Sequence, residues 1–203
     1  MDSTPKPRTG STQLGFFGGG SRTLVDDESG RIVYMPAFGD GPTAQRWFEA
    51  LRQGVAWQSE RRRMYDRDVD VPRLTAAYRL SDKDVPPTLA EAAVRAAKAA
   101  RTPFNSAGLN LYRDGRDSVA PHNDHLYEIV AGYPIALISL GATRLMTIRS
   151  KVKPRRVFDI DLEEGSLLLM SYETQLHYDH GIPKTRAAVG PRLSIALRVR
   201  PPL

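Results

Sequence analysis

The sequence contains no cysteine. A chain without cysteine has no disulfide framework, no thiolate zinc site and no cysteine nucleophile, and this composition suits a reducing compartment. The chain also lacks an apolar run of about 18 residues, the length that a membrane-spanning helix needs. Its opening residues, MDSTPKPRTGSTQ, do not contain the hydrophobic segment of a secretory signal peptide. We therefore expect a soluble, cytoplasmic protein that does not enter a membrane.

Acidic residues are in the minority, with 23 Asp and Glu against 29 Lys and Arg, which gives a formal net charge of +6. A positive net charge is compatible with a polyanionic partner such as nucleic acid, but many basic enzymes never bind one. At 203 residues the chain is long enough to form one domain with a substantial core. Composition therefore sets the size of the domain and leaves its function open.

The first part of the chain is predicted to be a tail followed by helices. Residues 1–30 are rich in Gly, Ser, Thr and Pro, so we expect a flexible N-terminal tail and a domain over residues 31–203. Residues 31–35 read as the first strand, and apolar spacing predicts a helix over residues 43–54. A second helix is predicted to begin with a capping box formed by Thr88 and Glu91. The charged residues between these helices are predicted to form a functional loop or an irregular edge.

The second half of the chain has the pattern of short strands. After Pro103, alternating or β-branched runs are separated by Gly, Pro and charged residues, without helices between them. This order predicts a mainly β fold of the α+β class, an antiparallel sandwich or barrel with the two helices packed on one outer face.

The four histidines fall into two tight clusters, PHNDH and QLHYDH. His122 and Asp124 are two residues apart, so on a strand both side chains would point to the same face and could bind one metal ion. With His180 as a third ligand, the set matches the two-histidine, one-carboxylate arrangement of non-haem Fe(II) oxygenases. His125 and His177 offer rival assignments, and a zinc hydrolase with an activated water uses the same residue types.

The C-terminal run RLSIALRVR predicts a strand with two different faces. Alternate residues from Leu193 are all apolar, whereas the other face carries Arg192 and Arg198 separated by small residues. Two guanidinium groups beside a cleared groove suit a small dianion, although an edge strand with a solvated face would show the same pattern. Asn110 and Tyr112 share one face of another predicted strand and could complete the hydrogen bonding of the anion.

Taken in order, these motifs resemble a known family, the AlkB-type Fe(II)/2-oxoglutarate-dependent dioxygenases. The similarity covers residues 30–200 and is closest to the bacterial branch near the animal nucleic-acid repair homologues. The segments that carry it are RIVYMPAF, MYDRDVDVPRLTAAY, NLYRDGRDSVAPHND, ISLGATR, GSLLLM, TQLHYDHGIPK and GPRLSIALR.

The resemblance implies a double-stranded β-helix, or jelly roll, with N-terminal helices supporting one sheet. It implies that Fe(II) is bound by His122, Asp124 and His180. It implies that 2-oxoglutarate is held by Asn110, Tyr112, Arg192, Ser194 and Arg198.

The implied reaction is oxidative dealkylation of an N-alkylated base in DNA or RNA, in which O2 and 2-oxoglutarate are consumed and formaldehyde is released. Arg73, Tyr78 and His125 are the candidate substrate-binding residues. The region around the substrate departs from the family, because His125 and Leu126 stand where relatives have two acidic residues. Relatives usually have Trp-Tyr-Gly where this chain has Ala77-Tyr78-Arg79, and the aromatic hairpin that follows it in relatives is missing here. We therefore expect weak recognition of a flipped base and a preference for single strands.

Two other functions remain open on the sequence alone. The same chemistry could act on a protein or a small molecule, as the reduced lid suggests. A catalytically inactive nucleic-acid-binding module is the other alternative, although such a module would not need both metal and anion residues. No obligate protein partner is indicated by the sequence.

Overall fold

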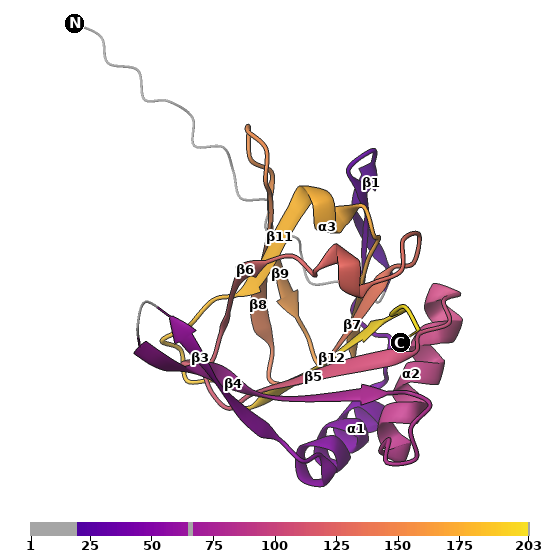
Figure 1. Cartoon of the computed structure of the whole chain (residues 1–203), viewed down its shortest axis with the longest axis vertical. Coiled ribbons are helices and arrows are strands. Elements are labelled where there is room, and N and C mark those ends of the chain that lie inside the picture. The colour runs from indigo at the N-terminus through magenta and orange to yellow at the C-terminus, as the bar shows by residue number, and fades with distance from the viewer. Residues whose placement is uncertain (1–19, 65–66, 203) are drawn as a thin grey trace, which may run out of the picture.

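A computed structural model describes residues 20–64 and 67–202, with the side chains of residues 60–70 outside the description. The described residues form two antiparallel sheets, one of eight strands in the order β1-β2-β10-β7-β12-β5-β4-β3 and one of four strands in the order β6-β11-β8-β9. The prediction of a mainly β, jelly-roll fold is confirmed (Figure 1). No helix among the described residues is long and apolar enough to cross a membrane.

The elements have the following bounds. The larger sheet contains β1 (Arg22–Asp27), β2 (Gly30–Met35), β3 (Gln58–Met64), β4 (Arg67–Arg79), β5 (Ser106–Tyr112), β7 (Ile135–Gly141), β10 (Ser166–Met170) and β12 (Arg192–Arg198). The smaller sheet contains β6 (Val119–His122), β8 (Arg144–Ser150), β9 (Val157–Leu162) and β11 (Tyr178–Ile182). The helices are α1 (Gly41–Gly54), α2 (Pro87–Ala100), the short α3 (Thr174–His177) and the 3₁₀ turn η1 (Leu126–Glu128).

Helices α1 and α2 pack on the outer face of the larger sheet, as predicted (Figure 1). The fully buried side chains of Trp47 and Leu51 from α1 and of Leu89 from α2 meet apolar residues of β5, β7 and β12. Asp40 caps α1, because its carboxylate accepts a hydrogen bond from the backbone N–H of Thr43 at 2.8 Å. Burial of these apolar faces fixes the position of the sheet whose opposite face lines the site.

The predicted capping box of α2 is wrong. Pro86 occupies the N-cap position without a side-chain hydrogen bond, and Thr88 lies inside the helix. Glu91 does not reach back to the helix start, because its two carboxylate oxygens bind the guanidinium of Arg46 at 2.6 and 2.8 Å. The two prolines fix the backbone at the helix entry without a capping side chain, and Glu91 links the two helices instead.

A second apolar core lies between the two sheets. It contains Tyr34 and Leu168 from the larger sheet and Ile148 and Ile160 from the smaller one. The hydroxyl of Tyr34 donates a hydrogen bond to the backbone carbonyl of Asp161 at 2.8 Å, so the sheets are also joined by a polar contact. This core holds the sheets together, and residues of both sheets line the pocket of the site.

Two segments are more regular than the sequence suggested. Strand β1 lies inside the predicted tail and pairs with β2, so the ordered domain begins before residue 31. Only Val25 of this strand is buried, which explains why side-chain periodicity gave no signal for an edge strand formed by backbone pairing. Residues 1–19 of the tail lie outside the described residues. The region predicted as a loop or irregular edge forms the antiparallel β3–β4 hairpin at the opposite edge of the sheet.

Candidate active site

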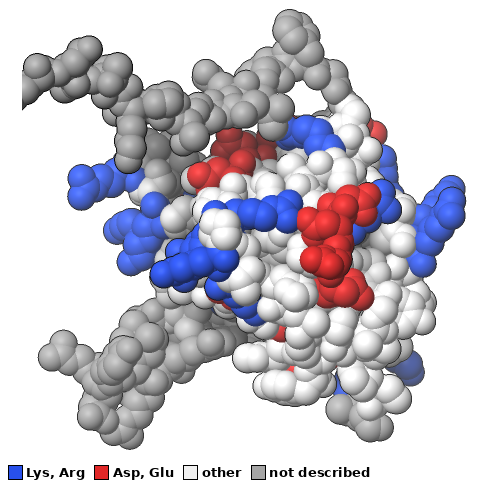
Figure 2. All heavy atoms as spheres, turned by 90° about the horizontal axis from the view of Figure 1, so that it is seen from above, with Lys and Arg blue, Asp and Glu red and all other residues white. Residues whose placement is uncertain are grey.

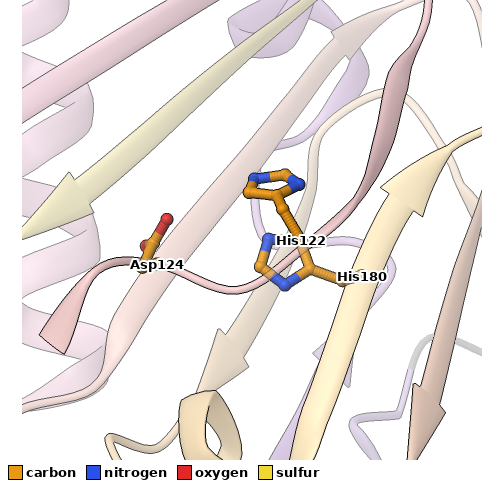
Figure 3. A group of neighbouring side chains, drawn as sticks. All are labelled: His122, Asp124 and His180. Carbon is orange, nitrogen blue, oxygen red and sulfur yellow. The ribbon is translucent and has the colours of Figure 1, made fainter. Parts of the chain in front are cut away.

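His122, Asp124 and His180 lie together in a pocket lined by residues of both sheets (Figure 3). One ligand atom from each residue lies within 4.8 Å of the others, and no other such cluster is present in the described part of the chain. His122 ends β6 and is paired directly with His180 of β11, which places their ring centroids 4.6 Å apart. The cross-strand register therefore brings together the two histidine clusters that are far apart in sequence.

Asp124 joins the cluster for a different reason from the one that the sequence suggested. Strand β6 ends at His122, so Asp124 lies in the following loop and is not placed by strand alternation. Its backbone N–H donates to Oε1 of the buried Gln175 at 3.0 Å, and its carboxylate accepts two hydrogen bonds from Arg198 at 2.7 and 2.9 Å. These two contacts position the carboxylate. Gln175 was not identified from the sequence, which shows no feature that would single it out.

The protonation states of the cluster suit a divalent metal ion. Burial lowers the pKa of His180 from 6.5 to about 4, with a further contribution from the neighbouring His122. Burial alone would raise the pKa of Asp124, but Arg198, His180 and His122 keep it below the usual value. A neutral imidazole and an ionised carboxylate are therefore available at neutral pH, which are the forms that bind metal.

His125 and His177 are outside this cluster, which removes the rival ligand assignments. His125 is exposed, and its ring stacks on that of Tyr127 with centroids 5.3 Å apart. His177 ends α3 and lines a separate cavity together with Tyr178 and Arg156.

Arg192 lines the same pocket as the metal cluster and could hold an anion there. Its side chain is buried, and burial lowers the pKa of the guanidinium. Nη2 donates to Oγ of Ser139 at 2.8 Å, whereas Nε and Nη1 have no hydrogen-bond partner among the described residues. Two unpaired donors of a buried cation are costly unless a ligand completes them, and a carboxylate matches their forked geometry. The observation fits a 2-oxoglutarate carboxylate at this position.

All the residues predicted to hold the cosubstrate line one pocket with the metal cluster. The polar lining residues are Arg73, Asn110, Tyr112, His122, Asp124, His180, Arg192, Ser194 and Arg198. The remaining wall is mostly apolar and includes Ile135, Leu137, Met146 and Met170. A pocket with apolar walls and a few convergent polar groups is the usual form of a small-molecule site.

The solvated-edge alternative for the last strand is wrong, because β12 is an inner strand between β7 and β5. Leu193, Ile195 and Leu197 pack beneath the helices, while the arginines face the pocket. Ser139, the partner of Arg192, was missed by the sequence analysis. A single hydroxyl in the otherwise apolar run of β7 is the signal that could have found it.

The three predicted substrate residues have different surroundings. Nε of Arg73 donates to Oδ1 of Asn110 at 2.7 Å, so Arg73 orients a residue of the cosubstrate pocket. His125 is exposed and does not line the pocket. The assignment of Tyr78 to substrate binding is corrected, because Tyr78 pairs with Ala107 and packs against the core under the helices, on the face opposite the pocket. Alternation along β4 puts its neighbours Ala77 and Arg79 on the other face.

Comparisons with known proteins agree with this arrangement. The model of the 2OG-Fe(II) oxygenase superfamily matches residues 31–198. The chain is 32% identical over 187 residues to human alpha-ketoglutarate-dependent dioxygenase alkB homolog 3, covering 83% of this chain and 65% of that protein. It is 29% identical over 187 residues to mouse DNA oxidative demethylase ALKBH2, covering 81% and 78%. Bovine DNA oxidative demethylase ALKBH2 is 33% identical over 126 residues, covering 59% and 45%.

The chain spans less than two thirds of the bovine and human relatives, at 45% and 65% of their lengths. The matched region nevertheless includes every residue of the metal cluster and of the cosubstrate pocket. The family description names Fe(II) and 2-oxoglutarate, the metal and the dicarboxylate that the cluster and Arg192 fit. The chain therefore belongs to the 2OG-Fe(II) oxygenase superfamily and is of the AlkB type.

Proposed function

We propose that the chain is a 2-oxoglutarate-dependent dioxygenase that removes alkyl groups from the nitrogens of bases in DNA or RNA. The observation that carries the enzymatic part is one pocket that contains both a three-residue metal cluster and the unpaired guanidinium nitrogens of Arg192. An inactive binding module would have no use for these two features together. The ALKBH2 relatives are named DNA oxidative demethylases, which supports alkylated DNA as the substrate.

In this proposal His122, Asp124 and His180 hold Fe(II), and Arg192 binds one carboxylate of 2-oxoglutarate. When bound, Fe(II) and 2-oxoglutarate would allow O2 to oxidise an alkyl carbon. Asn110 and Tyr112 line the same pocket and would orient the cosubstrate, and Arg73 donates to Oδ1 of Asn110 at 2.7 Å. The apolar residues of the pocket exclude water, so that the charged contacts of the site act in a medium of low dielectric.

Charge gives limited support for a nucleic-acid substrate. On the face seen from above, Lys and Arg side chains are spread around a compact acidic cluster (Figure 2). The positive charge therefore does not form one continuous stripe on this face. The chain as a whole still carries a net charge of +6, which favours a polyanion at low salt.

The lid region supports a preference for single strands. The segment between β4 and α2 is a short turn that contains no aromatic residue. Stacking on an aromatic side chain stabilises a bound base by about 1–3 kcal/mol, so its loss weakens capture of a base that must be unpaired first. A single strand does not require this unpairing.

The test is a comparison of single-stranded and duplex oligonucleotides that contain 1-methyladenine or 3-methylcytosine. Formaldehyde and succinate are measured at two salt concentrations with the Fe(II)-loaded protein. We expect both products from single strands, with lower activity at the higher salt concentration. Succinate without formaldehyde from any oligonucleotide would overturn the nucleic-acid substrate and favour a protein or a small molecule. Absence of both products would overturn the proposal that the chain is an enzyme.

A further inference from the structure

 

A second cavity, with a volume of about 330 Å³, lies beside the catalytic pocket. The cavity is formed by the end of β4, the start of β5, η1 and the segment after β12. We call it the Tyr127 pocket, and its lining residues are Arg79, Ser81, Asn105, Ser106, Tyr127, Glu128, Arg200, Pro201 and Pro202.

The Tyr127 pocket lies next to the metal cluster. Ser106, in its wall, pairs directly with Arg198 across β5 and β12. Arg198 in turn holds the carboxylate of Asp124 at 2.7 and 2.9 Å. Tyr127 follows Asp124 by three residues, in the 3₁₀ turn that leads away from the cluster. A ligand in this pocket would therefore lie beside a substrate held at the metal.

Tyr127 presents an aromatic ring to solvent. Its exposed fraction is 78%, the highest among the large hydrophobic side chains of the described residues. The ring is stacked on that of His125, with centroids 5.3 Å apart and planes inclined by 24°. A ring held by a stacking neighbour loses less conformational entropy when a ligand binds to it. Because the ring of Tyr127 is exposed and held in place by His125, it is suited to stacking on a planar ligand.

Arg79 adds an available positive charge on the same side of the sheet. It pairs with Ser106 across β4 and β5, which places both residues on the face that lines the site. Arg79 is exposed, and no other described residue forms an ion pair or a hydrogen bond with its guanidinium. Arg200, by contrast, is paired with Glu128 at 2.9 Å, so it closes the pocket wall rather than attracting an anion.

Two polar groups of the wall, from Asn105 and Ser106, donate to backbone carbonyls. The side-chain amide of Asn105 donates to the carbonyl of Arg200 at 2.8 Å, and the hydroxyl of Ser106 donates to the carbonyl of Arg198 at 3.2 Å. These groups are therefore not aimed at the edge of a base. The ring of Tyr127 can stack on a base and Arg79 can bind a phosphate, but these two groups do not distinguish one base from another. The pocket therefore suits a nucleotide with any of the bases.

We propose that the Tyr127 pocket binds the nucleotide adjacent to the alkylated one, with its base stacked on Tyr127 and its phosphate near Arg79. This inference rests on the proposed action on nucleic acid. It gives the chain a stacking surface on the 3₁₀ turn, in place of aromatic residues on the short segment between β4 and α2.

The test measures binding of a fluorescently labelled, unmethylated single-stranded oligonucleotide to the full chain. Tyr127→Ala should raise Kd by about 5- to 160-fold, the loss expected for one stacked base. Tyr127→Phe keeps the ring and should bind as the wild type does. Tyr133→Ala is the matched control, because Tyr133 is also an exposed tyrosine but does not line the pocket. Arg79→Ala should weaken binding and reduce the salt slope by about one.

A second readout separates this pocket from the catalytic pocket. Demethylation of a methylated mononucleoside, which has no neighbouring nucleotide, should be the same in Tyr127→Ala and the wild type. A contrary outcome is that the wild type binds and demethylates oligonucleotides while Tyr127→Ala and Arg79→Ala both keep its Kd. That result would overturn the proposed role of the Tyr127 pocket and leave the proposed function standing. A wild type that oxidises 2-oxoglutarate but neither binds nor demethylates any oligonucleotide would overturn the proposed substrate and the pocket together.

Discussion

Arg198 and Asp124 form an ion pair with two parallel hydrogen bonds, Nε to Oδ2 at 2.7 Å and Nη2 to Oδ1 at 2.9 Å. Both side chains are largely buried, with exposed fractions of 18% and 11%. An ionised carboxylate has about four lone-pair sites, so the pair leaves Asp124 able to bind a metal ion. The guanidinium from β12 thus orients a metal-binding carboxylate that stands in a loop.

Arg198→Lys should weaken Fe(II) binding. Lysine keeps the positive charge but cannot make the two parallel contacts, so the carboxylate loses its orientation. Loss of a residue that orients a metal ligand costs about 10- to 100-fold in metal affinity. Anaerobic titration with Fe(II) measures the change, and Arg116→Lys, on an arginine whose side chain is 89% exposed, is the control. Equal affinity in Arg198→Lys and the wild type would show that the ion pair does not position Asp124.

Alanine at His122, Asp124 or His180 should abolish Fe(II)-dependent succinate formation and lower metal binding. Each substitution removes one of three ligands, and the cluster has no substitute within reach among the described residues. His125→Ala and His177→Ala should keep metal binding, because both histidines lie outside the cluster. Loss of metal in the His125 variant equal to that in the Asp124 variant would refute the ligand assignment.

Arg192→Met should raise the KM for 2-oxoglutarate with a smaller effect on metal affinity. Removing one partner of a buried charge pair costs about 3–5 kcal/mol, which corresponds to two to four orders of magnitude in affinity. Ser139→Ala removes one hydrogen bond to the guanidinium and should cost about 1 kcal/mol, a several-fold effect. Circular dichroism checks that both variants fold. A KM unchanged in the Arg192 variant would place the dicarboxylate elsewhere.

The metal-free protein should lose stability as the pH falls from 6.5 to 4, because of His180. Its pKa is about 4 in the folded chain and 6.5 in the unfolded chain, so only the unfolded state takes up a proton in this window. A shift of this size corresponds to roughly 3 kcal/mol of unfolding free energy. Urea denaturation at several pH values measures it. His180→Gln should flatten the dependence in this window, and an equally steep dependence in that variant would assign the effect to another group.

Tyr78→Ala should lower stability without changing the binding of oligonucleotides. The ring is half-buried against the core beneath the helices, so its removal should cost about 1–2 kcal/mol. Thermal unfolding and oligonucleotide binding are measured on the same preparation. Weaker oligonucleotide binding at unchanged stability would restore the substrate role that the structure contradicts.

The sequence predicted the parts of the site that lie on inner strands. Arg192 and Arg198 could be assigned to one face because the opposite face of β12 must be apolar to pack beneath the helices. The same reasoning placed Asn110 and Tyr112 on β5. Period-two alternation is informative wherever the two faces of a strand meet different surroundings.

Other features could not be predicted because long-range contacts determine them. Asp124 lies in a loop and is positioned by Arg198 and Gln175, residues that are 74 and 51 positions away. The local spacing predicted that Asp124 lies beside His122, which the structure shows, but strand alternation is not the reason. Strand β1 is held by backbone pairing at an edge, which leaves little trace in its side chains.

The two faces of β12 also constrain how this chain can change. Insertion of one residue in the middle of the strand would turn every following side chain to the opposite face. Arg198 would then point into the apolar layer beneath the helices, and Leu197 would occupy its place beside Asp124. The loop between β11 and β12, by contrast, can change in length without this inversion. Length variation among related chains should therefore be confined to such connections, while the strand itself accepts substitutions but not insertions.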